Sequence, residues 1–274
     1  MKVKFYGTRG SIPICDSGFQ EFGGNTTCVA VFGEEHGDIL VFDAGTGIRN
    51  LGKELMQRTF HPSQKITLMF SHFHWDHIQG FPFFAPAYDS SKVIDIGIMG
   101  DDSKISNLKE VFNRQMDETY FPVQLDHMGA KFTFGASKIN EAVFPEGRLS
   151  VNKHSHPGGA YGYRLEYEEK VLVYCTDVEH GEEIDQSVVE LARGADLLIH
   201  EAQYTPEELP NFKGWGHSSW EQAIEVAEQA GVKKLYLTHH DPDHDDSFLR
   251  AVEKECQSQF SNCFLARDGL EVIV

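Results

Sequence analysis

Three histidines and an aspartate lie within six positions, immediately after a short apolar run. The run Ile66-Thr-Leu-Met-Phe70 has the composition of a buried strand, and Ser71-His-Phe-His-Trp-Asp-His77 follows it directly. Neutral imidazole and carboxylate groups are good ligands for zinc-like cations. If the strand continues, the first two histidines point the same way, whereas the aspartate and the last histidine lie past a bend and can face a second ion. The motif predicts a metal site at a strand end, because a chance match to its pattern is expected only roughly two times in a thousand.

Cysteine adds no ligands to this motif. The five cysteines are scattered and include no Cys-x-x-Cys pair: Cys15, Cys28, Cys175, Cys256 and Cys263. Neither a disulfide framework nor a thiolate zinc site is indicated, and buried reduced thiols are expected.

Short β-branched and aromatic runs alternate with helical patterns along the chain. The runs predict strands at 2–6, 27–33, 38–43, 66–70, 93–98, 131–134, 140–144, 149–155, 160–167, 171–175, 196–200, 234–238 and 270–274. Apolar residues at helical spacing predict helices at 47–58, 104–117, 218–230 and 246–259. The third helix is expected to start with a capping box formed by Ser218 and Glu221. Strands mixed with helices predict a layered α/β fold, and the absence of repeats or long linkers predicts one domain over 1–274.

Residues 101–128 form the least regular stretch. Tyr120-Phe-Pro-Val123 has the composition of an extended turn. Met116, Tyr120 and Phe121 either pack a small satellite core or line the mouth of a substrate site. The segment is therefore the candidate for a lid within the domain.

The charge balance is acidic. Lys and Arg number 24 and Asp and Glu number 42, which gives a formal charge of −18. Such a surface repels polyanions on average, so no broad nucleic-acid binding face is expected. No apolar run approaches the roughly 18 residues of a membrane span, and the first residues read as a strand rather than a secretory signal. We expect a cytoplasmic protein without a membrane partner, and a homodimer remains open.

The motifs along the chain resemble those of the metallo-β-lactamase fold, in that family's order. Besides the histidine motif they are Gly7-Thr-Arg-Gly-Ser11, Gly23-Gly-Asn-Thr-Thr27, Asp43-Ala-Gly-Thr-Gly47, His156-Pro-Gly-Gly159, Gly162-Tyr-Arg164, Thr176-Asp177, His200-Glu-Ala-Gln203, Gly216-His-Ser-Ser219 and Leu237-Thr-His239. The resemblance covers nearly the whole chain and is greatest to the ribonuclease Z-like phosphodiesterase branch. It implies an αββα sandwich, in which two mixed β-sheets are flanked by helices.

The resemblance also implies seven metal ligands around two divalent ions. The first ion would be held by His72, His74 and His156, the second by Asp76, His77 and His239, and Asp177 would bridge both. The residues support this set independently, because Asp177 and His239 each end an apolar strand and would share a sheet edge.

Two of these assignments have neighbouring alternatives. His154 shares a strand face with His156, and His240 adjoins His239. The Pro-Gly-Gly that follows His156 and the strand that ends at Thr238 favour the assignments above. His240 and His244 are then expected at the surface, in an acidic loop.

Three further residues have roles that the resemblance implies. Asp43 ends a strand before a glycine turn, and it resembles the aspartate of this family that orients a metal-binding histidine. The alternative is that Asp43 only forms the turn. His217 would lie over a scissile phosphate, with its tautomer held by Glu201. It would donate a hydrogen bond to a phosphoryl oxygen or a proton to the leaving oxygen. The alternative is that His217 only precedes the helix that starts at Ser218.

The implied activity is hydrolysis at two metal ions about 3.5–4 Å apart, which would share an attacking hydroxide. Asp76 would bind metal and also accept or relay the proton. Zinc is the favoured ion, and manganese or iron also suits nitrogen and oxygen ligands.

The expected substrate is a small phosphodiester, either a cyclic nucleotide or a short oligonucleotide. Transfer-RNA processing is disfavoured because ribonuclease Z typically inserts a basic arm between the third histidine motif and the bridging aspartate. Here only 21 positions separate His156 from Asp177. Lactone, thioester or β-lactam hydrolysis on the same metals is the alternative, and a non-enzymatic metal sensor is the third reading.

Overall fold

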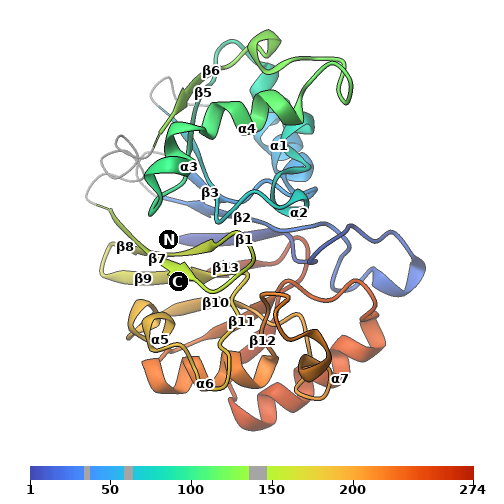
Figure 1. The fold of residues 1–274 in the computed structure, drawn as a ribbon, viewed down its shortest axis with the longest axis vertical. Helices are drawn as coiled ribbons and strands as arrows, with labels where there is room; N and C mark the ends of the chain where they lie inside the picture. The colour runs from blue at the N-terminus through green and yellow to red at the C-terminus, as the bar shows by residue number, and fades with distance from the viewer. Residues whose placement is uncertain (34–37, 59–63, 136–146) are drawn as a thin grey trace.

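The computed structural model describes residues 1–33, 38–58, 64–135 and 147–274. Figure 1 shows four layers, in which two β-sheets lie against each other and helices cover the outer face of each sheet. This arrangement confirms the predicted α/β class and the αββα sandwich. The predicted strand at 140–144 lies outside the described residues.

The first sheet has seven strands. Their order across the sheet is β13 (Glu271–Ile273), β1 (Lys2–Gly7), β2 (Cys28–Phe32), β3 (Ile39–Phe42), β4 (Ile66–Met69), β5 (Val93–Gly97) and β6 (Lys131–Phe134). Strands β13 to β3 pair antiparallel, whereas β3 to β6 pair parallel. The parallel part brings the carboxyl ends of β3 and β4 to one edge.

The second sheet has six strands. Their order is β12 (Cys263–Leu265), β11 (Leu235–Thr238), β10 (Leu197–Glu201), β9 (Lys170–Cys175), β8 (Ala160–Tyr167) and β7 (Arg148–His154). Strands β9 to β12 pair parallel, and β7 to β9 form an antiparallel meander. The ends of β9, β10 and β11 therefore also meet at one edge.

Seven α-helices and five short 3₁₀ helices lie in the described part of the chain. The α-helices are α1 (Ile48–Met56), α2 (Trp75–Ile78), α3 (Asp102–Ser106), α4 (Leu108–Gln115), α5 (Gln186–Ala192), α6 (Trp220–Ala230) and α7 (Asp246–Gln259). The 3₁₀ helices are Ser17–Phe19, Phe81–Phe83, Ala85–Tyr88, Leu125–His127 and Leu209–Phe212. Helices α1, α3 and α4 lie on the side of the first sheet, and α5 to α7 lie on the side of the second (Figure 1).

The core explains why the central strands are apolar along their whole length. Strands β2, β3 and β4 are buried at every residue, because one face meets the other sheet and the opposite face meets helices. Between the sheets, Phe42 of β3 stacks on Tyr163 of β8 and Tyr174 of β9, with ring centroids 5.6 and 4.9 Å apart. This aromatic layer fixes the two sheets beside the end of β3.

The structure differs from the sequence prediction at two helices. The predicted helix at 104–117 is broken into α3 and α4 at Asn107, whose side-chain amide donates to the carbonyl of Ser103. The capping box of α6 is formed by Ser219 and Gln222, one residue later than expected. The hydroxyl of Ser218 instead donates to the carbonyl of Val178.

None of the helices in the described ranges combines the length and the apolar character that crossing a membrane requires.

Candidate metal centre

The histidine motif occupies the turn between β4 and α2. β4 ends at Met69, and His74 is the extended N-cap residue of the short helix that carries Asp76 and His77. His72, Asp76 and His77 are buried, whereas His74 is exposed. The change from strand to helix turns the two halves of the motif toward different neighbours.

The other predicted ligands reach this turn from strand ends in the second sheet. Asp177 follows β9, His239 follows β11, and His156 lies two residues beyond the end of β7. Asp43 follows β3 in the first sheet. The seven predicted ligands therefore converge where the carboxyl ends of parallel strands from both sheets meet, which is the usual place for a site in such folds.

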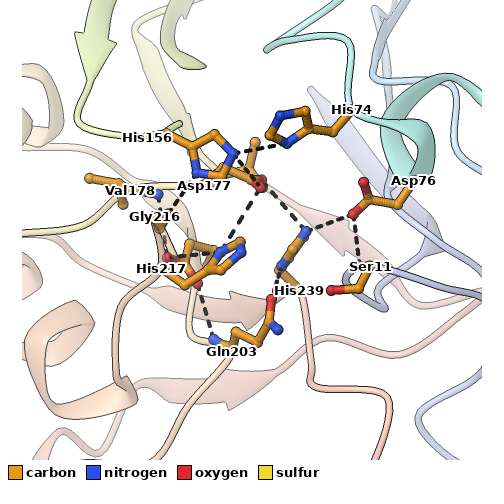
Figure 2. A network of polar contacts seen from close by, with 12 residues as sticks. Ser11, His74, Asp76, His156, Asp177, Val178, Gln203, Gly216, His217 and His239 are labelled. Atoms are coloured by element: carbon orange, nitrogen blue, oxygen red, sulfur yellow. Dashed lines mark hydrogen bonds and ion pairs between the residues drawn. The ribbon is translucent and has the colours of Figure 1, made fainter. Parts of the chain in front are cut away.

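Three of the histidines form one group of potential ligands. Nitrogen atoms of His72, His74 and His156 lie within 4.8 Å of one another. The His156 Nε2 atom is 3.0 Å from Nδ1 of His74 (Figure 2). Nδ1 of His156 donates to the carbonyl oxygen of Gly216 at 2.8 Å, which leaves the Nε2 lone pair facing the group.

A second group contains Asp76, His77 and His239, whose ligand atoms also lie within 4.8 Å of one another. Oδ2 of Asp76 is 3.4 Å from Nε2 of His77 and 3.2 Å from Nε2 of His239. Both rings use Nδ1–H elsewhere, since His77 donates to Asp43 at 2.9 Å and His239 donates to Oε1 of Gln203 at 3.0 Å.

Asp177 lies between the two groups, with one oxygen toward each. Its Oδ1 is 3.7 Å from Nε2 of His72 and 3.7 Å from Nε2 of His156. Its Oδ2 is 3.2 Å from Nε2 of His77 and 3.6 Å from Nε2 of His239. Figure 2 shows this carboxylate at the centre of the cluster.

This arrangement fits metal ions. Nδ1 of His77, His156 and His239 is held by outward partners, so Nε2 of each ring faces a carboxylate. Without a metal ion the facing carboxylates outweigh burial and raise the pKa of His77 and His239, so a proton lies between each of these two rings and its carboxylate. A metal ion can replace these protons, because it binds the freed Nε2 lone pairs and the carboxylates together. The buried Nε2 atoms of His72 and His77 have no hydrogen-bond partner among the described residues.

The carboxylates at the centre are held ionised. Burial raises the pKa of Asp177, but the imidazoles of His239 and His77 outweigh burial and hold this pKa well below its ordinary range. In the same way, His77 and His239 overcome the burial of Asp76 and lower its pKa. Ionised carboxylates and Nε2 lone pairs are the forms that bind metal.

Asp43 orients His77 through a buried network. Its Oδ2 accepts from Nδ1 of His77 at 2.9 Å and from the hydroxyl of Tyr174 at 2.7 Å, and its Oδ1 accepts from the backbone N–H of Ser71 at 2.8 Å. This is the contact that the resemblance implied for Asp43. The sequence did not predict that Tyr174 contacts Asp43. The alternation of side chains along β9 does not show which group the Tyr174 hydroxyl contacts.

Three other supporting residues had no assigned role in the sequence. The N–H of Ser11 donates to Oδ2 of Asp76 at 2.8 Å, Gln203 accepts from His239, and Gly216 accepts from His156. Each lies in a motif that carries the resemblance. Their positions in those motifs were therefore the only signal that the sequence offered.

The backbone is strained at the strand ends that carry the site. Asp43, Asp177 and His239 have φ values of 59°, 55° and 61°, in the left-handed region that residues other than glycine rarely adopt. Such strain persists where surrounding contacts fix the chain, and it is common at functional sites.

His217 lies beside the two groups, and Glu201 lies behind it. Nδ1 of His217 is 4.0 Å from Oδ1 of Asp177 and 3.8 Å from Oε1 of Glu201, and both distances are too long for a hydrogen bond. Burial, opposed in part by Asp177, lowers the pKa of His217 to about 3, so the ring is neutral at pH 7. Burial raises the pKa of Glu201 to about 8, although backbone N–H groups of Gln203 and Ser218 oppose this shift.

The neighbouring histidines take different positions. His154 is buried with Nδ1 3.2 Å from the carbonyl of Thr176, and His240 donates to the carbonyl of Ala266 at 2.9 Å. Neither belongs to a group of converging ligand atoms in the described residues. The expectation that His240 and His244 are at the surface is wrong, since both are buried; His244 pairs with Glu208 at 2.9 Å.

The segment 101–128 contributes both to the core and to the surface. Met116 is buried and packs in the main core, whereas Tyr120 is exposed. Phe121 meets Phe83 edge to face at 5.5 Å.

A cavity of about 310 Å³ lies next to His217 and away from the segment 101–128. Its wall also includes Glu179, Lys213 and Gln222.

Residues 39–240 match the beta-lactamase superfamily domain, and this range contains all seven predicted ligands. The chain belongs to the metallo-β-lactamase superfamily. Members of this fold family bind divalent metal ions, which agrees with the donor set described above. The resemblance that the sequence motifs indicated is confirmed.

Relatives of this superfamily member match it from end to end. It is 24% identical to ribonuclease Z of Prochlorococcus marinus (strain NATL2A), over 99% of this chain and 98% of the relative. Its fold is similar to that of the metallo-β-lactamase fold protein YhfI from Bacillus subtilis, with a TM-score of 0.69, 21% identity and coverage of 99% and 98%. It is also similar to the short form of human tRNase Z, with a TM-score of 0.66, 19% identity and coverage of 100% and 99%. The protein is a metal-dependent hydrolase.

We predicted a small-molecule substrate and no broad nucleic-acid binding face. The comparisons contradict this prediction. The curated relative is a ribonuclease, and the human structural neighbour is a tRNase, so both names denote nucleic-acid substrates. The formal charge of −18 misled the prediction, because a net charge averages over the whole surface. It does not describe the few groups that contact a substrate.

Proposed function

We propose that this protein is a phosphodiesterase that cleaves a phosphodiester bond in RNA at a site for two divalent metal ions. The observation that carries the proposal is the position of Asp177, whose two oxygens face two separate groups of imidazole lone pairs. A carboxylate shared in this way is suited to hold two cations close together.

The two ions would be held by the groups described above. His72, His74 and His156 offer nitrogen to one ion, Asp76, His77 and His239 offer nitrogen and oxygen to the other, and Asp177 serves both. Zinc suits this set best, and manganese or iron is also accommodated by nitrogen and oxygen ligands. When bound, the ions lower the pKa of water and neutralise negative charge that develops on the phosphoryl group.

Asp76 is the residue that we propose to accept the proton released by the attacking water. Its carboxylate is ionised, and the N–H of Ser11 fixes Oδ2 at 2.8 Å. A carboxylate held in one orientation next to the reacting water can pass a proton on without rearranging.

His217 acts as a hydrogen-bond donor to a phosphoryl oxygen. Its ring is neutral at pH 7, and positive ions bound nearby would lower its pKa further below about 3. A neutral imidazole keeps one N–H for a hydrogen bond but is a weak source of a full proton. Of the two roles that the sequence left open, the lowered pKa favours the hydrogen bond.

Glu201 positions His217 through the backbone. Its carboxyl accepts from the N–H groups of Val178, Gln203 and Ser218 at 3.3, 3.0 and 2.5 Å. These three segments surround His217, and Ser218 is its neighbour in the chain. Glu201 is therefore a positioning residue, which supports the loop that presents the imidazole.

Metal analysis and a substrate panel test the proposal. Purified protein is assayed for bound metal and then for cleavage of a 3′-extended RNA, bis(p-nitrophenyl) phosphate, a lactone and nitrocefin. We expect about two equivalents of zinc or manganese, cleavage of the RNA, and loss of activity in His74→Ala. The exposed His127, outside the site, provides the control His127→Ala, which should keep full activity. Lactone or nitrocefin turnover with inert diesters would reject the proposal.

A further inference from the structure

Two of the three tryptophans are exposed and adjoin residues of the metal centre in the chain. Trp75 has 66% of its side chain exposed and stands between His74 and Asp76 in the chain. Trp215 has 60% exposed and directly precedes Gly216. The third, Trp220, is 4% exposed and packs in the core of the second sheet.

The two exposed tryptophans are attached to opposite sides of the site. Figure 2 shows His74 and Asp76, which flank Trp75, on one side of Asp177. It shows Gly216 and His217, which follow Trp215, on the other side. A chain that crosses the metal centre between these two sides would therefore pass the backbone segments that carry both tryptophans.

Trp215 is held in place by its own loop. Its ring meets Phe212 edge to face at 5.4 Å, and Phe212 stacks on Tyr204 at 4.3 Å. The loop is fixed by Glu179, whose carboxylate accepts from the N–H groups of Gly214 and Gly216 at 2.8 Å each. The ring is therefore supported from one side while most of its surface remains open.

Trp75 is fixed by the helix that carries two of the ligands. It is the first residue of α2, and its carbonyl accepts from the N–H of Gln79 at 2.7 Å. Because Asp76 and His77 follow in the same turn, the backbone of Trp75 cannot move without moving the site.

We propose that Trp75 and Trp215 stack on the two bases that flank the scissile phosphate, an inference that rests on the proposed cleavage of RNA. The proposed metal site would hold the scissile phosphate and not the bases on either side of it, so those bases need short-range contacts of their own. Stacking on aromatic rings supplies such contacts and accepts any base, because every base has a π-face.

The first test measures binding to the metal-loaded protein. The probe is a short RNA in which one phosphonate linkage resists hydrolysis, and tryptophan fluorescence reports stacking. Trp75→Ala and Trp215→Ala should each weaken binding by about ten- to a hundred-fold, and the corresponding Phe variants should restore most of it. The double variant Trp75→Phe/Trp215→Phe retains only Trp220 and should bind RNA without quenching. Ile273→Ala, which removes an exposed side chain on the edge strand β13, should bind like the wild type.

The second test separates stacking from a structural effect. With RNA that lacks the bases on both sides of the same linkage, the alanine variants and the wild type should bind equally. Alanine variants that bind normal RNA within twofold of the wild type would overturn the inference, as would an equal loss on abasic RNA. If the wild type itself neither binds nor cleaves RNA, the proposed function fails and the inference falls with it. If the wild type cleaves RNA and the variants are unchanged, only the inference fails.

Discussion

Oδ2 of Asp43 lies 2.9 Å from Nδ1 of His77, and Nε2 on the far side of the same ring lies 3.2 Å from Asp177. One residue therefore connects a strand end of the first sheet to the carboxylate at the centre of the site. The hydroxyl of Tyr174, from the second sheet, reaches the same oxygen of Asp43 at 2.7 Å. The orientation of His77 thus depends on contacts from both sheets.

Tyr174→Phe is expected to lower metal affinity without unfolding the protein. The variant leaves Asp43 without one buried donor, so the carboxylate holds His77 less firmly. We expect a loss of up to about ten-fold in metal affinity, at the low end for contacts that support a ligand. Competition with a chelator measures this affinity.

Tyr163→Phe is the matched control for that variant. Tyr163 stacks on the same ring of Phe42, but its hydroxyl donates to the carbonyl of Phe70 at 2.7 Å, accepts from the N–H of Met99 at 3.2 Å and makes no hydrogen bond to Asp43. The Tyr163→Phe variant should lower the free energy of unfolding by about 1–3 kcal/mol and leave metal affinity unchanged. Equal effects of the two variants on metal affinity would show that the hydrogen bond to Asp43 is not responsible.

His217→Ala is expected to lower kcat by about 10²- to 10³-fold while the metal content stays unchanged. If His217 donates a hydrogen bond to a phosphoryl oxygen, the factor should be similar for a p-nitrophenolate leaving group and for a nucleoside leaving group. A proton donor would matter far more for the nucleoside, because its alkoxide is a poor leaving group. Rates on bis(p-nitrophenyl) phosphate and on a dinucleotide decide between the two roles.

Gly216→Ala should damage the site, whereas Gly214→Ala should only strain the backbone. Both glycines have positive φ, 90° and 86°, and both donate to Glu179. A Cβ at Gly216 would lie 2.1 Å from Nδ1 of His156, while a Cβ at Gly214 meets nothing within 4 Å.

The two alanine variants therefore separate strain from steric conflict. Each should lose about 1–2 kcal/mol of folding free energy from the left-handed backbone. Only Gly216→Ala should also weaken metal binding, by about 10- to 100-fold, because His156 must move. Calorimetric metal titration of both variants tests this, and unchanged affinity in Gly216→Ala would show that the ring tolerates displacement.

The sequence predicted the layers of the fold because its local signals were strong. Apolar runs such as 66–70 correspond to strands that are buried on both faces, and 246–259 is a helix over the residues predicted. Helix α2 was not predicted, since its four residues are too few to show a helical period. The break at Asn107 was also missed, because the apolar pattern continues across a side chain that bonds the backbone.

For the site, residue type and motif order predicted which side chains meet, but not how they are held. Apart from the place of these residues in motifs, the sequence does not indicate that Gln203 accepts from His239 or that Asp177 has a left-handed backbone. Burial of His240 was missed because its acidic neighbours suggest solvent, while its own ring donates to Ala266. These contacts are made between distant segments, which local patterns do not record.

Asp268→Asn should change how the free energy of unfolding depends on pH. Burial is the largest effect on this side chain and raises its pKa from 3.8 to about 6, against hydrogen bonds from Asn25. Between these values the native state binds the proton more tightly than the unfolded state, so wild-type stability falls as pH rises from about 4 to 6.

Asparagine does not ionise, so the Asp268→Asn variant should gain about 2 kcal/mol relative to the wild type over that interval. This gain is smaller than the full pKa shift implies, because the Asp268 side chain is partly exposed and solvent screens its charge. Asp245→Asn is the control and should show no such change between pH 4.5 and pH 7.5. The Phe248 N–H that caps α7 lowers the pKa of Asp245 below 3.8, so this carboxyl is ionised in both the folded and the unfolded state over that interval, and its stabilising effect is lost only below about pH 4. Urea unfolding of the three metal-loaded proteins at pH 4.5 and pH 7.5 gives these differences directly. The prediction fails if the stability difference between the wild type and Asp268→Asn is the same at both pH values. Asp268 would then titrate normally and be ionised in the folded protein at little cost.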